Sequence, residues 1–156
     1  MNRFAATPLT LMALALGLVA CGGGDDAPSK ADFASDAEKI CQNAEKQLED
    51  VGQNASSPDE IAAAVDKVID ETQSSVDKLK ELKRPDGDAG EQAERFVNAV
   101  EGDIEDKGIP ALEDLRDALK DDDEAAARKA AGRLQALETT DSNKLASEIG
   151  ADACGN

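Results

Sequence analysis

The sequence predicts an all-α protein: an up-down-up-down antiparallel four-helix bundle that follows a cleaved signal peptide and a flexible tether. Apolar residues recur every three or four positions through four long segments, at about 32–51, 58–83, 88–120 and 122–150, which is the pattern of a helix with one buried face. No stretch of useful length alternates apolar and polar residues as a half-buried strand does. Because short connectors join the four segments, neighbouring helices should run antiparallel, and residues 32–154 should form one bundle domain.

The first two predicted helices have clear ends. The apolar stripe of 32–51 consists of Phe33, Ala37, Ile40, Ala44, Leu48 and Val51, and that of 58–83 consists of Ile61, Val65, Val68, Thr72, Val76 and Leu79. Before the second helix, Ser57 and Glu60 have the spacing of a capping box, and Pro58 occupies the first helical position. Pro85 and Gly87 end this helix, because neither residue continues it easily.

The last two predicted helices each contain an irregular point. In 88–120 the inner face is formed by Ala93, Val97, Val100, Ile104, Leu112, Leu115 and Leu119. Gly108 to Pro110 interrupts this face, and we favour one kinked helix, with two separate helices as the alternative. In 122–150 the inner face is formed by Ala127, Ala130, Leu134, Leu137, Leu145 and Ile149, and the polar stretch 138–144 indicates a local break. We hypothesise that both points are locally soft; the alternative is that each is a surface irregularity with no role.

The N-terminal segment has the layout of a secretory signal. Arg3 supplies a positive charge, and an uncharged apolar stretch of about a dozen residues follows from Leu9 to Ala20. This stretch is shorter than the roughly 18 to 20 residues of a membrane-spanning helix. We therefore predict a cleaved leader at 1–20. The Gly-, Asp-, Pro- and Ser-containing segment 21–31 is predicted to be a flexible tether.

The sequence Leu18-Val19-Ala20-Cys21 resembles the lipobox of bacterial lipoproteins. The resemblance implies a diacylglyceryl group on the Cys21 sulfur and cleavage before this residue. It also implies an extracytoplasmic protein anchored to the cell membrane by lipid, in the outer membrane if the organism has two membranes. Two acyl chains give stable anchoring where one gives marginal binding. An ordinary signal peptide cut at another small residue is the alternative.

Cys41 and Cys154 remain once Cys21 is acylated. Outside the cytosol such a pair is expected to oxidise, and in an up-down-up-down bundle the first and last helices place them at the same pole. A disulfide between them closes a loop of about 113 residues, which the chain-entropy treatment values at roughly 4 to 5 kcal/mol. The alternative is one buried thiol and one exposed thiol. A metal site is disfavoured because there is no histidine.

Two further stretches, SKADFASDAEKIC after the lipobox and the closing CGN, resemble small helical lipoproteins of high-GC Gram-positive bacteria. That resemblance implies the same fold and the same disulfide. It implies no activity, because none is assigned to those proteins.

The charge of the chain restricts its partners. The protein carries 17 basic and 34 acidic residues, a net charge of −17 at pH 7, and loss of Arg3 with the leader makes it about −18. Nucleic-acid binding requires clustered Lys and Arg to neutralise phosphates, so no nucleic-acid partner is expected. The expected partners are the membrane, through the lipid on Cys21, and envelope proteins with cationic surfaces.

No catalytic or cofactor-binding constellation is predicted. The absence of histidine removes the common general base, the catalytic dyads and triads and the carboxylate–histidine ligands of di-iron bundles. The run Asp121–Glu124 is interpreted as a helix start rather than a calcium site, and the segment 86–90 lacks calcium-loop spacing. We therefore expect no catalytic residues, no metal and no cofactor. The predicted function is a non-catalytic, lipid-anchored interaction or structural module of the cell envelope; the alternative is a carrier for a lipid, a small apolar molecule or divalent cations.

Overall fold

The described part of the chain is entirely helical. The structure is a computed structural model, and it describes residues 27–139 and 141–155, among which there is no β-strand, as the predicted all-α class requires. The elements are α1 (Lys30–Leu48), α2 (Pro58–Glu81), α3 (Gly87–Asp103), a π-helix (Ile104–Gly108), α4 (Ile109–Lys120), α5 (Glu124–Gln135), a 3-10 helix (Ala136–Thr139), α6 (Asp141–Ile149) and a C-terminal 3-10 turn (Asp152–Gly155). The predicted leader at 1–20, Cys21 and the first part of the tether lie outside the described residues.

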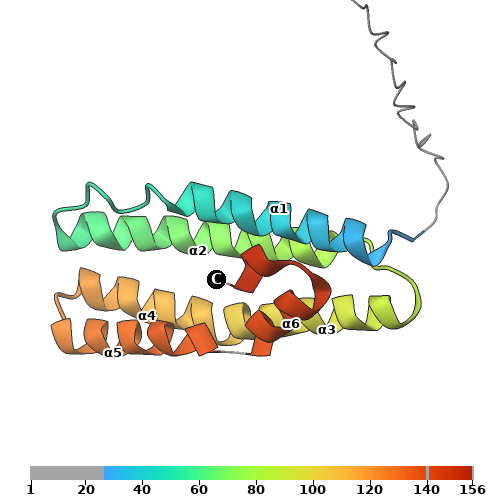
Figure 1. The fold of residues 1–156 in the computed structure, drawn as a ribbon. Coiled ribbons are helices and arrows are strands. Elements are labelled where there is room, and N and C mark those ends of the chain that lie inside the picture. The colour runs from blue at the N-terminus through green and yellow to red at the C-terminus, as the bar shows by residue number, and fades with distance from the viewer. Residues whose placement is uncertain (1–26, 140, 156) are drawn as a thin grey trace, which may run out of the picture.

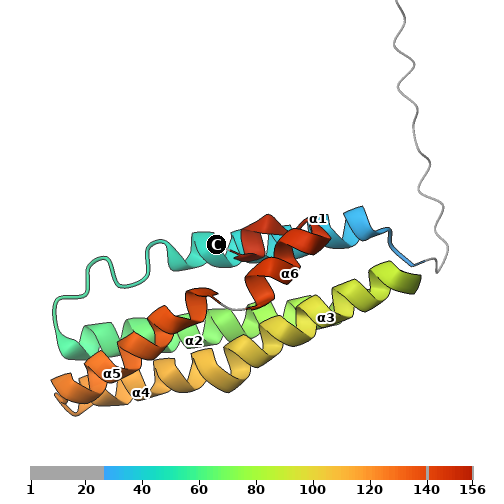
Figure 2. The same cartoon turned by 60° about the horizontal axis from the view of Figure 1, so that its bottom comes forward.

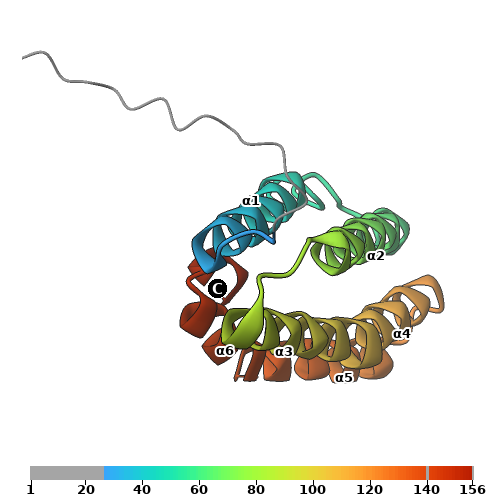
Figure 3. The ribbon, with the colours of Figure 1, turned by 90° about the vertical axis from the view of Figure 1, so that its right-hand side faces the viewer.

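The helices pack in pairs along a common long direction. In Figure 1, α1 lies along α2, and α4 lies along α5, while α3 and α4 follow one another in a single rod. Figure 2 shows α2 beside α4, and the view in Figure 3 places the C-terminal turn between α1 and α6. The described chain is thus a helical bundle in which α2 contacts both α1 and α4.

The first helix begins two residues earlier than predicted, because a capping box at its start was not identified in the sequence. The Ser29 side chain accepts a hydrogen bond from the Asp32 amide, and the Asp32 carboxylate accepts one from the Ser29 amide. The predicted capping box of the second helix is present, formed by Ser57 and Glu60. The helices also end earlier than predicted, at Leu48 and Glu81.

The third predicted helix, 88–120, is helical throughout but contains a π-helix instead of a simple kink. In this wider turn the Ile109 amide donates to the Ile104 carbonyl oxygen, five residues earlier. Pro110 has no amide hydrogen, and in an α-helix its ring would clash with the carbonyl four residues before it. The π-helix widens the turn there, so the rod continues through Gly108 without a break.

The fourth predicted helix is divided by the 3-10 helix Ala136–Thr139, in the region where the sequence indicates a break. This division lies against the π-helix. A Cβ atom added at the buried Gly108 would be 3.6 Å from Leu137 Cδ1, and 3.4 Å from the Asp103 carbonyl oxygen. A Cβ atom there would meet both atoms at ordinary van der Waals distance, and the two points predicted to be soft are neighbours in the fold.

The buried core consists of two clusters along the bundle. The larger cluster contains Phe33, Ala37, Leu79, Ala93, Phe96, Val97, Ala146, Ile149 and Ala151. The smaller one contains Val65, Ile69 and Ile109, with partly buried leucines of α4 around it. Both phenylalanines of the described chain lie in the larger cluster, where Phe96 is fully buried. The larger cluster is therefore expected to contribute most of the apolar stabilisation.

The second capping box predicts a pH-dependent stability. Hydrogen bonds from the backbone and side chain of Ser56, and then from Ser57, lower the pKa of Glu60 below its ordinary 4.5. A carboxyl with a lowered folded pKa stabilises the fold fully above its unfolded pKa, and this contribution is lost as pH falls through the folded value. We expect Glu60→Gln to lower the free energy of unfolding at pH 7. The difference from wild type should begin to shrink near pH 4.5 and should be lost once the pH is below the lowered folded pKa of Glu60. Urea unfolding across pH 3 to 7 measures this. Glu113→Gln, at an exposed position of α4, is the control, and an equal pH dependence in both variants would contradict the assignment.

The hydroxyl of Ser75 gives a second stability prediction. Ser75 is 9% exposed, and its Oγ has no hydrogen-bond partner among the described residues. A buried, unpaired hydroxyl costs free energy, so we expect Ser75→Ala to raise the free energy of unfolding by about 1 kcal/mol. Ser74→Ala, at the half-exposed neighbouring position, should change it by less than about 0.5 kcal/mol. Denaturant unfolding measures both variants; destabilisation by Ser75→Ala would mean that an internal water or another partner satisfies the hydroxyl.

Candidate functional site

The C-terminal turn is fastened to α1 by the predicted disulfide. Cys41 and Cys154, 113 residues apart, are joined by an S–S bond of 2.05 Å, with 5.2 Å between their Cα atoms. Gly150, with φ of +87°, lets the chain reverse after α6, and the Ala151 amide then donates to the Ala146 carbonyl oxygen. This reversal carries the last 3-10 turn back onto α1.

The disulfide belongs to the larger core cluster. Cys41 and Cys154 are both partly buried and pack against it. Cys154 Sγ lies 3.5 Å from the Ala37 carbonyl oxygen, a packing contact because a disulfide sulfur carries no hydrogen. The closed turn contacts both α1 and α6. The cross-link therefore connects the two ends of the described chain through the region that contains both phenylalanines.

The end of α2 is organised by Arg84, which the sequence analysis did not identify. Its guanidinium donates to the carbonyl oxygens of Leu79 at 3.1 Å and Lys80 at 3.4 Å, and also to that of Leu82. The same group lies over the Phe33 ring, with 5.4 Å between its carbon and the ring centroid. Burial lowers the pKa of Arg84 below its ordinary value, but the charge is retained because arginine titrates far above neutral pH. Arg84 thus caps the last carbonyls of α2 and covers one edge of the core.

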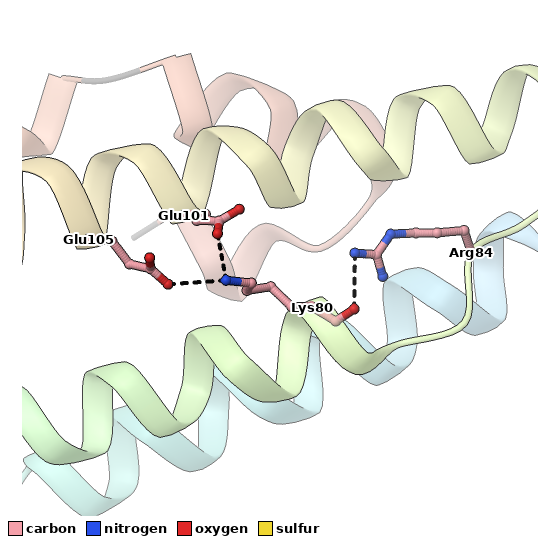
Figure 4. Close-up of polar contacts among 4 residues, drawn as sticks. All are labelled: Lys80, Arg84, Glu101 and Glu105. Carbon is pink, nitrogen blue, oxygen red and sulfur yellow. Dashed lines mark hydrogen bonds and ion pairs between the residues drawn. The ribbon is translucent and has the colours of Figure 1, made fainter.

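Lys80 joins α2 to the rod formed by α3 and the π-helix. Its Nζ lies 2.5 Å from Glu101 Oε1 and 3.3 Å from Glu105 Oε1, as Figure 4 shows beside Arg84. The hydrogen bond that Lys80 donates to the Glu101 carboxylate raises the pKa of Lys80 above its ordinary value. The three side chains are about one-third or more exposed, so this ion pair orients the helices more than it stabilises them.

The acidic runs have structural roles in the described chain. The Asp123 carboxylate accepts hydrogen bonds from the Ala125 and Ala126 amides at 3.0 Å each, so the predicted helix start at Asp121–Glu124 is confirmed. Asp86 occupies the N-cap position of α3, where its side chain makes no capping hydrogen bond within the described chain. Across residues 27–139 and 141–155, no group of three or more histidine, cysteine, aspartate or glutamate side chains is placed to hold a metal ion.

The structure describes two of the three cysteines to which the sequence analysis assigns a role. The structure brings Cys41 and Cys154 together, while Cys21 lies outside the described residues. Arg84 could have been suspected from its place between the last turn of a helix and Pro85, where a long cationic side chain reaches free carbonyls. Nothing in the sequence indicates which acids Lys80 contacts, because these lie 21 and 25 residues away on another element.

Comparisons with protein-family models, with curated proteins and with solved structures gave no match. Among the helices of residues 27–139 and 141–155, none combines the length and the apolar character that crossing a membrane requires.

Loss of the disulfide is expected to destabilise the fold strongly. For a cross-link of residues separated by 113 positions, Cys41→Ala with Cys154→Ala should lower the free energy of unfolding by about 4 to 5 kcal/mol, since the unfolded chain regains its freedom. Urea unfolding measures the difference. Dithiothreitol should lower the stability of the wild type to that of the double variant and leave the double variant unchanged. A double variant as stable as the wild type would show that packing alone holds the C-terminal turn.

Proposed function

We propose that this protein is a lipid-anchored lipoprotein of the bacterial cell envelope and acts as a non-catalytic interaction or structural module. The observation that carries the proposal is the sequence Leu18-Val19-Ala20-Cys21 at the end of an apolar leader. Acylation of Cys21 would hold the protein at the membrane surface, since two chains bind stably. The anchored domain would be an up-down-up-down four-helix bundle, with α3 and α4 forming one of its members and α5 and α6 another.

The disulfide supports an extracytoplasmic location. Structural disulfides persist in secreted and envelope proteins, whereas the cytosol keeps most thiols reduced. The cysteines at positions 41 and 154 are paired in the structure, and the third cysteine of the chain is the one at the lipobox. A chain with one cysteine for the lipid and two for a cross-link matches the chemistry of that compartment.

The shape of the domain supports presentation of one end to a partner. Residue 27, where the described chain begins, lies at the end of the bundle that also holds the α2–α3 connection (Figure 1). The α1–α2 connection and the α4–α5 turn lie at the opposite end. With α2 alone containing 24 residues, a rise of about 1.5 Å per residue separates the two ends by about 36 Å. A lipid on Cys21 would therefore attach the domain through its first end and leave the second end free of the anchor.

Mutation of the lipobox cysteine tests the proposal. The full-length protein expressed in a bacterium should partition into the detergent phase of Triton X-114, and its intact mass should show a chain that begins at Cys21 and carries diacylglyceryl and one disulfide. Cys21→Ala should move the protein to the aqueous phase, because the acylated residue is lost. Cys41→Ser with Cys154→Ser should leave partitioning unchanged. A native chain that begins before residue 21, or that carries three free thiols, would contradict the proposal.

A further inference from the structure

A surface groove lies at the end of the bundle opposite residue 27. Figures 1 and 2 show the end of α1, the 49–57 connection and the start of α2 at that end. The residues that line the groove come from these three segments. A hollow of about 560 Å³ and a neighbouring one of about 310 Å³ share Gln47, Val51 and Lys67 as lining residues. The two hollows are therefore neighbours on the surface of α1 and α2, and together they are called the α1–α2 groove.

The floor of the groove is apolar and shallow. Leu48 and Val51 contribute half-buried side chains, and Ala63 and Ala64 of α2 add only methyl groups, which are too small to fill the hollow. Ile61, one turn before Ala64, is 40% exposed. Positions three apart on a helix are neighbours on its surface, so this isoleucine extends the apolar area. The groove can therefore accommodate an apolar side chain of a partner.

The rim of the groove is acidic. Asp50, Asp70 and Glu71 line it with Glu60, and Lys67 is the single cation among the described residues that line the two hollows. Glu71 accepts a hydrogen bond from Gln47 Nε2 at 2.8 Å, and Asp50 accepts one from Gln53 Nε2 at 3.2 Å. These donors are uncharged, so they leave the negative charge of both carboxylates in place. A cationic group near the floor would be attracted by this rim.

We propose that this groove binds a segment of another envelope protein that carries apolar residues together with lysines or arginines. An apolar side chain of the segment would lie over Leu48, Val51 and Ala64, and its cations would pair with Asp70, Glu71 and Asp50. This inference rests on the proposed function, because it takes the partner from the envelope, and it assigns the site through which that function operates. Since the groove lies at the end remote from residue 27, lipid anchoring through Cys21 would leave it accessible.

A designed peptide tests the groove directly. The probe is a fluorescein-labelled 14-residue helical peptide with leucines on one face and lysines on the other, titrated into the full-length protein and followed by fluorescence anisotropy. We expect saturable binding that weakens as salt is added, because exposed ion pairs are screened. A peptide with the leucines replaced by glutamine should bind at least about tenfold more weakly, since the apolar contact is lost. A peptide with the lysines replaced by glutamate should not bind.

Variants of the protein locate the binding site. Asp70→Asn with Glu71→Gln should weaken binding by about fivefold, and Ala63→Phe, which fills the floor from an exposed position, by about tenfold. Asp121→Asn with Asp122→Asn removes the same charge at exposed positions of the α4–α5 turn and should change binding by less than about twofold. Circular dichroism and the melting temperature establish that each variant is folded.

The outcomes separate this inference from the function on which it rests. Equal weakening by the groove and control variants would show general attraction to a negative surface and overturn the groove, while leaving the envelope proposal in place. An absence of binding by the lysine–leucine peptide would also overturn the groove. Failure of the Cys21 experiment with a groove that still binds the peptide would instead overturn the envelope location and leave the binding surface intact.

Discussion

The covalent link between Cys41 and Cys154 is the constraint on which the rest of this structure depends most. A chain whose described part contains only two phenylalanines and no tyrosine or tryptophan must form its core largely from alanine, valine, leucine and isoleucine. Small side chains allow helices to approach closely, but each buries little area, so the apolar stabilisation per residue is low. The cross-link compensates by restricting the unfolded chain, and it does so at the cluster that contains Phe33 and Phe96. The C-terminal turn, which has little core of its own, is held between α1 and α6 by the same bond.

Irregular backbone is concentrated where two long helical segments meet. The π-helix at Ile104–Gly108 and the 3-10 helix at Ala136–Thr139 are neighbours, because Leu137 lies beside Gly108. An electrostatic interaction also joins the π-helix to the start of α6. The hydrogen bond to Asp103 raises the pKa of Lys107, and the charge of Asp141 raises it further but less strongly. Both members of the bundle therefore contain irregular backbone at one level. It is also the level at which the two core clusters are separated.

The acidic character of the protein has more than one physical role. Asp32, Glu60 and Asp123 satisfy backbone amides at helix starts, and other acids pair with cations between helices, as Asp66 does with Arg116 and Lys120. These groups are occupied by the fold itself. Asp50 and Glu71 at the α1–α2 groove differ, because they accept hydrogen bonds from the neutral side-chain amides of Gln53 and Gln47 and cap no helix. The negative charge of these two carboxylates is therefore available to attract a cationic partner.

The sequence by itself determined the all-α class, the approximate extents of the four helical segments, the capping box at Ser57 and Glu60, the helix start at Asp123 and the choice of Cys41 and Cys154 as a pair. These features depend on local periodicity, on capping chemistry within a few residues, or on elimination among three cysteines, and such information is present in the linear chain. The tertiary structure alone decided that Pro110 is accommodated by a π-helix and that Ser75 is buried with no partner among the described residues. It also decided that Arg84 covers Phe33, and that Leu48, Ala63, Asp70 and Glu71 line two neighbouring hollows. Each of these depends on which faces of separate helices meet, and the packing of side chains across several elements fixes that geometry.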